Sequence, residues 1–367
     1  MPPPPTLADL RRFAIARSLF APTTLPRALA KLGFVQADPI RAPARAQDLT
    51  LRHRVKDYRA GDLERRYPRL DIEEDFFVNY GFLTRDLQRL MHPRGERRAW
   101  SRTQRKRAVA VLEYIRERGA VHPRDVDAHF AHGKVTNWFG GTSNASTQLL
   151  DGMHYRGQLR IARRDGGIRV YSAREAHEPA PDPVAAMDAL VDVIVAKYAP
   201  LPERSLGELV SRLAYGAPQW KTDRRAAFKR ALARHPSVVI DGVRWLWPDG
   251  ENPRAAKHRI DDTVRLLAPF DPVVWDRRRF ELFWGWPYRF EAYTPAPKRV
   301  RGYYALPLLW RDHVIGWGNL TSRNGHIVAE LGYSNGVAPT ETAFAGALEA
   351  ELERLQVFLS PQRHLDI

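Results

Sequence analysis

Apolar residues recur at helical spacing near the start of the chain and are followed by a short extended run. In "TLADLRRFAIARSLF", Leu7, Leu10 and Ala14 repeat with the period of a helix. The segment "LPRALAKLG" has a proline near its start and Gly33 just past its end, the usual order at helix boundaries. We predict that "KLGFVQADPIRAP" is extended and that "ARAQDLTLRHRVKDY" is helical. This first unit, residues 1–99, closes near "LMHPRGERR".

The middle of the chain shows one order of elements twice: three helices and then a β-hairpin. In residues 100–178 we predict helices in "TQRKRAVAVLEYIRERG", "HPRDVDAHF" and "SNASTQLLDGMHYRG", the last capped by Ser143 or Asn144. An Asp-Gly turn then joins two strands in "QLRIARRDGGIRVYS". In residues 179–250, "TDRRAAFKRALARHP" is the third helix, with Thr222 as its cap, and "SVVIDGVRWLWP" is the hairpin. This is the order of a winged helix, so we predict tandem winged helices, with residues 1–99 as a degenerate third copy.

The residue composition of the sequence changes at about residue 264. Aromatic and β-branched runs are interrupted there by Gly, Pro and Asp, which predicts several antiparallel strands in a small barrel or sheet. Residues 251–367 end with "PTETAFAGALEAELERLQVFL", predicted as an amphipathic helix capped by Thr340. The predicted fold class is therefore α+β: three winged-helix domains, a small antiparallel β-barrel or sheet, and a C-terminal helix.

The charge of the chain indicates which kind of partner it binds. There are 58 Lys and Arg against 42 Asp and Glu, a net charge of +16. Residues 1–300 hold 53 basic and 35 acidic residues, whereas residues 301–367 hold 5 and 7. A basic surface of this size indicates a polyanionic partner, most often nucleic acid. A GC-rich genome would favour arginine over lysine, but it would not favour bases over acids.

Other classes of protein are excluded by what the sequence lacks. It has no cysteine, hence no disulfide scaffold and no thiolate nucleophile. No apolar run reaches the roughly 18 residues of a membrane span, and no secretory apolar core precedes the first helix. The 12 histidines form no metal-binding motif, and no phosphate-binding P-loop occurs. We expect a cytoplasmic, nucleoid-associated monomer that contacts no membrane.

A polar pair interrupts the apolar run at residues 31–43. Side chains alternate along an extended backbone, so Gln36 and Asp38 would share one face, opposite Val35. Pro39 favours extended geometry at the residue before it. Asp-Pro is also a common turn signal, and spacing alone favours a turn over a functional pair.

Two stretches of the sequence resemble the YcaQ/AlkZ family of bacterial winged-helix DNA glycosylases. They are "LGFVQADPIRAPARAQ" and "LLAPFDPVVWDRRRFELFWGWPYRFEAYTPAPKRVRGYYALPLLW", and the resemblance extends over essentially the whole chain. Relatives carry a catalytic Gln, one intervening residue, then Gln or Asp, and Gln36-Ala37-Asp38 matches the Gln-x-Asp form. The chain is a divergent member, since Gln47 and Asp48 stand where relatives often carry histidines.

The resemblance implies excision of N7-alkylated purines from double-stranded DNA in base-excision repair, including the unhooking of interstrand crosslinks. An N7-alkylated purine is cationic and leaves readily, through an oxocarbenium-like transition state at C1′. Asp38 would stabilise that charge and accept a proton from water, and Gln36 would hold the water. We expect hydrolysis to an abasic product with neither metal nor cofactor.

Contacts to the DNA backbone are predicted for basic residues in every unit. Arg52 and Arg54 follow the motif and either contact phosphates or form an exposed basic face. Arg277 and Arg278 either contact DNA or pair with Asp271 or Asp276. The other candidates are Arg160, Arg163 and Arg164 in the hairpin of the second unit, Lys221, Arg224 and Arg225 at the start of the third unit's last helix, and Lys298, Arg299 and Arg301 in a loop. The aromatic residues Trp284, Trp286, Tyr303 and Tyr304 are predicted to be core.

Two alternatives remain at this point. The first is a non-enzymatic winged-helix protein, either a transcriptional regulator or a branch that binds DNA without chemistry. The Gln-x-Asp pair speaks against it, because a regulator has no need for the pair. The second is a hydrolase acting on RNA, which only the net charge favours.

Overall fold

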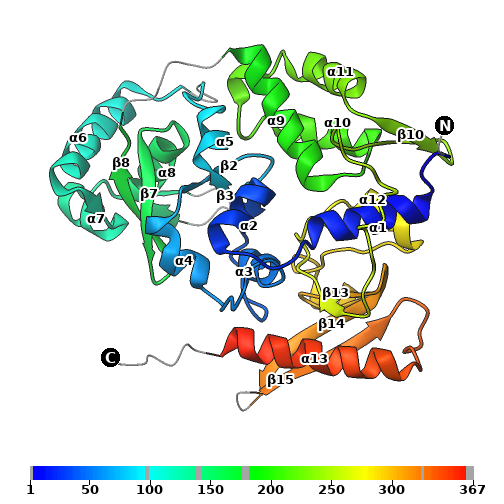
Figure 1. Cartoon of the computed structure of the whole chain (residues 1–367). Coiled ribbons are helices and arrows are strands. Elements are labelled where there is room, and N and C mark those ends of the chain that lie inside the picture. The colour runs from blue at the N-terminus through cyan, green and yellow to red at the C-terminus, as the bar shows by residue number, and fades with distance from the viewer. Residues whose placement is uncertain (1–2, 96–98, 137–141, 176–181, 324–325, 361–367) are drawn as a thin grey trace. The chain divides into compact units, whose positions relative to one another are not determined.

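The computed structural model describes residues 3–95, 99–136, 142–175, 182–323 and 326–360 (Figure 1). The chain forms two compact units. One comprises Met1–Leu63, Val191–Leu209 and Phe228–Ile367, and the other comprises Glu64–Leu190 and Val210–Ala227. None of the helices in the described ranges has both the length and the apolar character that crossing a membrane requires.

The second predicted winged helix has its expected elements. They are α6 (Arg102–Arg118), β4 (Ala120–Val121), α7 (Pro123–Phe130), α8 (Ala145–Tyr155), β7 (Leu159–Asp165) and β8 (Ile168–Ala173), with the short pair β5 (Lys134–Thr136) and β6 (Thr142–Asn144) before α8. The sheet order is β4-β8-β7. The Ser101 hydroxyl caps α6 by accepting from the backbone N–H of Gln104, and Pro123 is the first residue of α7. Asn144 is the cap residue of α8 but makes no side-chain capping bond.

The turn of this hairpin lies one residue later than predicted. Asp165 pairs with Ile168 as the last step of the ladder, so the two-residue loop is Gly166-Gly167 rather than Asp-Gly. Both glycines have positive φ, 58° and 88°. Two successive positive φ angles match the right-handed twist of the strands, and glycine adopts them without steric cost.

The third predicted winged helix repeats this order. It contains α9 (Pro183–Tyr198), β9 (Leu201–Pro202), α10 (Glu203–Arg212), η2 (Pro218–Trp220), α11 (Arg224–Arg234), β10 (Ser237–Ile240) and β11 (Val243–Leu246), with sheet order β10-β11-β9. Here the Asp-Gly turn is as predicted, because Asp241 and Gly242 have φ of 49° and 75°. Helix α11 begins at Arg224, so Thr222 is not its cap residue.

The N-terminal region has the same sequence of elements, preceded by one extra helix. They are α1 (Leu7–Ser18), α2 (Leu25–Leu32), β1 (Phe34–Gln36), α3 (Ala46–Leu51), α4 (Asp62–Arg66), η1 (Tyr67–Arg69), β2 (Ile72–Phe76), β3 (Tyr80–Thr84) and α5 (Arg85–Arg89). From α2 to β3 the order is again helix, strand, two helices and hairpin. The four domain boundaries given above remain a prediction.

The helix predicted over "ARAQDLTLRHRVKDY" is only α3, which ends at Leu51. Beyond it the backbone turns to pair with Thr23, whose N–H donates to the Arg54 carbonyl at 2.9 Å and whose carbonyl accepts from Lys56 at 3.0 Å. A helix through these residues would forgo both bonds, so a tertiary contact overrides the helical pattern.

The C-terminal region is a curled antiparallel sheet covered by a helix. The sheet runs in the order β12 (Val264–Leu266), β13 (Leu306–Trp310), β14 (His313–Arg323) and β15 (His326–Tyr333). Helix α13 (Thr342–Leu359) contacts β12 and β15 (Figure 1). Its cap residue is Glu341, so the prediction of Thr340 was wrong.

Residues 267–305 contain no strand in the described structure, although their aromatic runs predicted several. They contain α12 (Arg277–Trp284) and the short η3 (Ala296–Lys298). The Asp276 carboxylate accepts from two N–H groups of the first turn of α12, and Gly285 ends that helix in a left-handed conformation. Two strong end signals therefore outweigh the β propensity of the aromatic residues between them.

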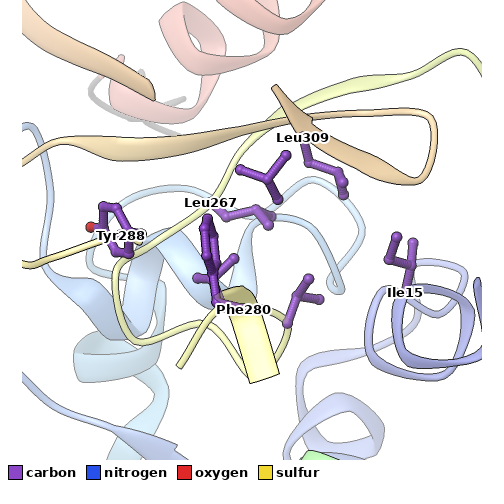
Figure 2. Packing of buried hydrophobic residues seen from close by; sticks show 8 residues of the cluster. Ile15, Leu267, Phe280, Tyr288 and Leu309 are labelled. Carbon is purple, nitrogen blue, oxygen red and sulfur yellow. The ribbon is translucent and has the colours of Figure 1, made fainter. Parts of the chain in front are cut away.

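A hydrophobic cluster ties α1 and α12 to this sheet (Figure 2). It comprises Ile15, Leu267, Val273, Val274, Phe280, Tyr288, Leu309 and Val314. Trp284 and Trp286 pack against it half-buried, and Tyr304 is buried, as predicted. Tyr303 is 45% exposed, so its assignment to the core was wrong.

Candidate active site

The Gln-x-Asp stretch lies at the end of strand β1. Gln36 and Asp38 are 7% and 9% exposed, and both residues that precede them in the strand are buried. The strand ends at Gln36, so the alternation of faces does not continue to Asp38. Instead one oxygen of Asp38, Oδ1, accepts from the Ile40 N–H at 2.9 Å across Pro39. The stretch is therefore both a turn and a nearly buried polar pair.

The orientation of the Gln36 amide is determined by a tryptophan. The Trp275 Nε1–H group donates to Gln36 Oε1 at 2.8 Å. An indole N–H can only donate, so the atom that faces it must be the amide oxygen. The Gln36 NH₂ group is consequently directed away from Trp275 and can act only as a donor.

Asp38 is a carboxylate held in the protein by a single hydrogen bond. Its second oxygen, Oδ2, has no hydrogen-bond partner among the described residues, and no described cation pairs with it. Burial raises the pKa of Asp38 above its ordinary value, and the hydrogen bond from Ile40 opposes this shift. One oxygen of an uncompensated negative charge is thus available for chemistry.

Two further residues form hydrogen bonds to the backbone of this stretch. Gln47 is buried, and its Oε1 accepts from the Asp38 N–H at 3.4 Å. The Lys197 ammonium donates to the Phe34 carbonyl, two residues before Gln36. Burial, with the nearby Arg54 charge, lowers the pKa of Lys197 to about 7. These contacts hold the backbone before Gln36 and at Asp38.

Three of these supporting residues were not predicted as functional. Trp275 lies in the family-like run "DPVVWDRRR", where its position between two aspartates was the available signal. Gln47 follows Asp38 by nine residues, and the resemblance described above gives it no role. Nothing in the local sequence singles out Lys197, because its partner lies 163 residues away.

Arg52 and Arg54 point into the protein. The Arg54 side chain is fully buried and forms a two-pronged ion pair with Asp271, at 2.7 and 2.9 Å. Arg52 pairs with the buried Glu351 and donates to the Leu266 carbonyl. Asp48 is likewise internal, since it accepts from the Tyr58 hydroxyl at 2.7 Å. In this structure neither arginine is available to a phosphate, and neither forms an exposed basic face.

The arginines of strand β7, in the hairpin of the second winged helix, pair with acidic side chains. Arg160 and Arg164 pair with the buried carboxylates of Glu73 and Glu74, respectively, on β2. Arg163 is 48% exposed at its side chain and pairs with its neighbour Asp165 at 3.0 Å. Of these three, Arg163 is the most exposed, since the Arg160 and Arg164 side chains are 31% and 15% exposed.

The remaining predicted DNA contacts differ in exposure. Lys221, Arg225 and Lys298 are exposed, whereas the half-buried Arg224 donates to the Ser211 carbonyl at 2.6 Å. Arg299 donates to the Thr294 carbonyl, and Arg301 is close to Glu291.

Arg277 and Arg278 do not pair with Asp271 or Asp276. Arg277 donates to the carbonyls of Val274 and Pro269 at 2.6 and 2.8 Å. Arg278 is partly exposed and lies 3.4 Å from Glu208. The two aspartates are engaged elsewhere, in the Arg54 ion pair and the α12 cap. In the ranges that the structure describes, no three acidic or histidine side chains converge as metal ligands would.

A match to a family model shows the class of protein: a DNA repair enzyme that hydrolyses N-glycosidic bonds. The sequence model of the AlkZ-like DNA glycosylase family matches residues 29–358. The chain therefore belongs to the AlkZ-like DNA glycosylase family, as its resemblance predicted. It is similar in structure to the DNA glycosylase AlkZ of Streptomyces sahachiroi, with a TM-score of 0.62 and 14% sequence identity over 96% of each chain. Membership of an enzyme family argues against the alternative of a non-enzymatic transcriptional regulator.

Proposed function

We propose that this protein is a monofunctional glycosylase that excises N7-alkylated purines from double-stranded DNA. The observation that carries the proposal is the nearly buried Asp38 carboxylate, with which no described cation pairs, two residues after an amide whose oxygen is bound by Trp275. Purines bonded through a cationic N7 to the opposite strand present the same leaving group, so interstrand crosslinks belong to the proposed substrates.

The donor role of Gln36 determines how it would hold the attacking water. The Gln36 NH₂ group donates to the water oxygen, and the water donates one proton towards Asp38 Oδ2. The N9–C1′ bond breaks and its electron pair neutralises the cationic purine. The water oxygen bonds to C1′, and its proton passes to Asp38. The Lys197 amine is committed to the Phe34 carbonyl, which supports hydrolysis over attack by an amine.

Phosphate contacts are proposed for the exposed cations. Lys221 and Arg225 lie at the start of α11, and Lys298 lies in the loop before β13. Such contacts make binding weaken steeply as salt concentration rises. We propose that the protein acts as a monomer close to the nucleoid.

We expect the enzyme to release 7-methylguanine from methylated duplex DNA, with a rate that falls at low pH. Asp38 must be ionised to accept a proton, and burial raises its pKa above 3.8. The value of kcat/KM, which reports ionisation of the free enzyme, should therefore rise with pH through a midpoint above 3.8. Release is measured by chromatography between pH 4 and 8, with enzyme-free DNA as the control for acid depurination. Absence of release from both methylated and N7-crosslinked duplexes would contradict the proposal.

We expect Trp275→Phe to slow excision about three- to tenfold, the value of one lost hydrogen bond, because the Gln36 amide is then free to rotate. Gln36→Ala should slow excision further, and adding Trp275→Phe to it should cost nothing more, since Trp275 acts through Gln36. Single-turnover rates on methylated DNA measure all three variants.

Trp286→Phe is the matched control for this cycle. Its indole N–H also donates to the protein, to the Val314 carbonyl at 2.9 Å, but it does not contact Gln36. This variant should excise at the wild-type rate. Additive losses in the double variant would show that Trp275 does not act by orienting Gln36.

A further inference from the structure

A cleft of about 770 Å³ lies between helix α12 and the segment that follows it. This volume is within the range of about 300–1,000 Å³ that is usual for binding sites. Among the described residues that line the cleft are three arginines, Arg277, Arg278 and Arg289, and one carboxylate, that of Glu281. Other parts of the wall are apolar and include Phe290. The cleft therefore combines an excess of positive charge with apolar surface.

Arg277 is half-buried in the wall of this cleft, and in the described part of the chain it forms no ion pair with a carboxylate. Its guanidinium donates to the carbonyls of Val274 and Pro269 at 2.6 and 2.8 Å. It also lies over the Tyr288 ring, 4.4 Å from the centroid. These bonds use two of the five N–H groups of the arginine and leave others for a ligand. A guanidinium held in this way is suited to phosphate, which it binds through charge-assisted hydrogen bonds.

The other two arginines extend the positive charge of the cleft. Arg289 is exposed, and it forms no ion pair with an acidic side chain of the described residues. Arg278 lies 3.4 Å from Glu208, while its buried Nε–H group has no hydrogen-bond partner in the part of the chain that the structure describes. Buried donors are normally satisfied, so an anion in the cleft would supply the acceptor that this group lacks.

The apolar surface of the cleft is fixed by packing and by a hydrogen bond. The Tyr288 hydroxyl donates to the Ala305 carbonyl at 2.7 Å. The Phe290 ring contacts the rings of Phe270 and Tyr304, with 5.1 and 5.2 Å between centroids. A wall that is already ordered loses little conformational entropy when a ligand binds.

The cleft adjoins the residue that orients Gln36. Val274, which accepts from Arg277, immediately precedes Trp275 in the chain. The Trp275 indole donates to Gln36 Oε1 at 2.8 Å. Arg277 is two residues after Trp275, at most about 7 Å along the backbone. Phosphates of one DNA strand follow one another at about 3.4 Å along the helix axis, so this separation is on the scale of a few nucleotides.

We propose that this cleft binds backbone phosphates of the damaged strand beside the nucleotide that is excised. The inference rests on the proposed function and deepens it, because it assigns the strand that carries the lesion to one surface. Arginines along an open cleft recognise the charge of a phosphodiester backbone rather than the identity of a base. The apolar wall contacts the sugar carbons between the phosphates.

The experiment measures binding to a duplex that carries 7-methylguanine on a 2′-fluoroarabino sugar, which resists hydrolysis. Arg289→Ala should weaken binding about two- to fivefold, the scale of an exposed ion pair. It should also lower the salt dependence of binding by about one phosphate contact. Glu281→Gln, in the same cleft, should strengthen binding, because it removes a negative charge beside the phosphates. Arg323→Ala is the matched control and should change neither quantity, since it removes an exposed arginine from residues 301–367, where acidic residues outnumber basic ones.

Replacing single phosphates by neutral methylphosphonates then identifies the strand. In wild type, replacement of a phosphate next to the lesion on the damaged strand should weaken binding, and in Arg289→Ala the same replacement should cost nothing further. Additive losses at every replaced phosphate would overturn the inference, as would coupling confined to the complementary strand. A loss in Arg289→Ala no larger than that in Arg323→Ala would overturn it as well.

Failure of the proposed function is distinguished by the wild type on ordinary methylated DNA, from which it would release no 7-methylguanine. The coupling between Arg289 and a phosphate is measured on the resistant duplex and does not depend on that release.

Discussion

Replacing Asp38 by asparagine is expected to reduce excision of 7-methylguanine by at least about a hundredfold, the scale on which single electrostatic groups act in catalysis. Asparagine retains an oxygen for the Ile40 N–H but supplies neither the negative charge at C1′ nor a proton acceptor. DNA binding should persist, since Asp38 adds a negative charge to a polyanion-binding surface. Single-turnover excision and a filter-binding titration on the same methylated duplex measure the two effects.

The stability of Asp38→Asn provides a second readout. A carboxyl whose pKa is raised by folding favours the protonated form, so its stabilising contribution is complete below pH 3.8 and is lost as pH rises through the higher folded pKa. At pH 7 the ionised carboxylate is therefore a cost, which asparagine removes. Thermal unfolding should show a variant no less stable than wild type at pH 7. Excision at the wild-type rate would remove Asp38 from the mechanism, and clear destabilisation at pH 7 would contradict its raised pKa.

Removing the Arg54 guanidinium is expected to destabilise the protein by about 3–5 kcal/mol, because Arg54→Met leaves Asp271 buried and without its cation. The loss of stability should extend to the site, since the backbone carbonyl of Asp271 accepts from the backbone N–H of Trp275 at 2.8 Å. The double variant Arg54→Met/Asp271→Asn should lose less free energy of unfolding than the two single variants lose in sum. Urea denaturation followed by tryptophan fluorescence measures each variant.

The matched control for Arg54 is an exposed cation. Lys221→Ala should leave the urea midpoint unchanged and lower the salt dependence of DNA binding by about one phosphate contact. Arg54→Met, measured where it is folded, should leave that salt dependence unchanged. The reverse pattern, an unaltered urea midpoint with a shallower salt dependence, would show that Arg54 contacts DNA.

The elements that were predicted correctly have signals within a few residues of themselves. Asp241-Gly242 defines its hairpin, and Ser101 and Pro123 define helix starts, because turns and caps depend on local backbone geometry. The predictions that failed lack such signals. Helix α3 is cut short by pairing with Thr23, and α12 replaces predicted strands because its two end residues outweigh the aromatic residues inside it.

The sequence by itself determined the order of helices and hairpins in residues 100–250, the family, the basic charge and the presence of the Gln36–Asp38 pair. Only the tertiary structure decided which polar groups face solvent and which form buried contacts that stabilise the fold. Arg54 meets Asp271 217 residues away, and Gln36 meets Trp275 239 residues away. The sequence does not distinguish an arginine that contacts a phosphate from one that pairs with a buried carboxylate. Its partner is set by chain folding, and burial strengthens that pairing because water no longer competes for the charge.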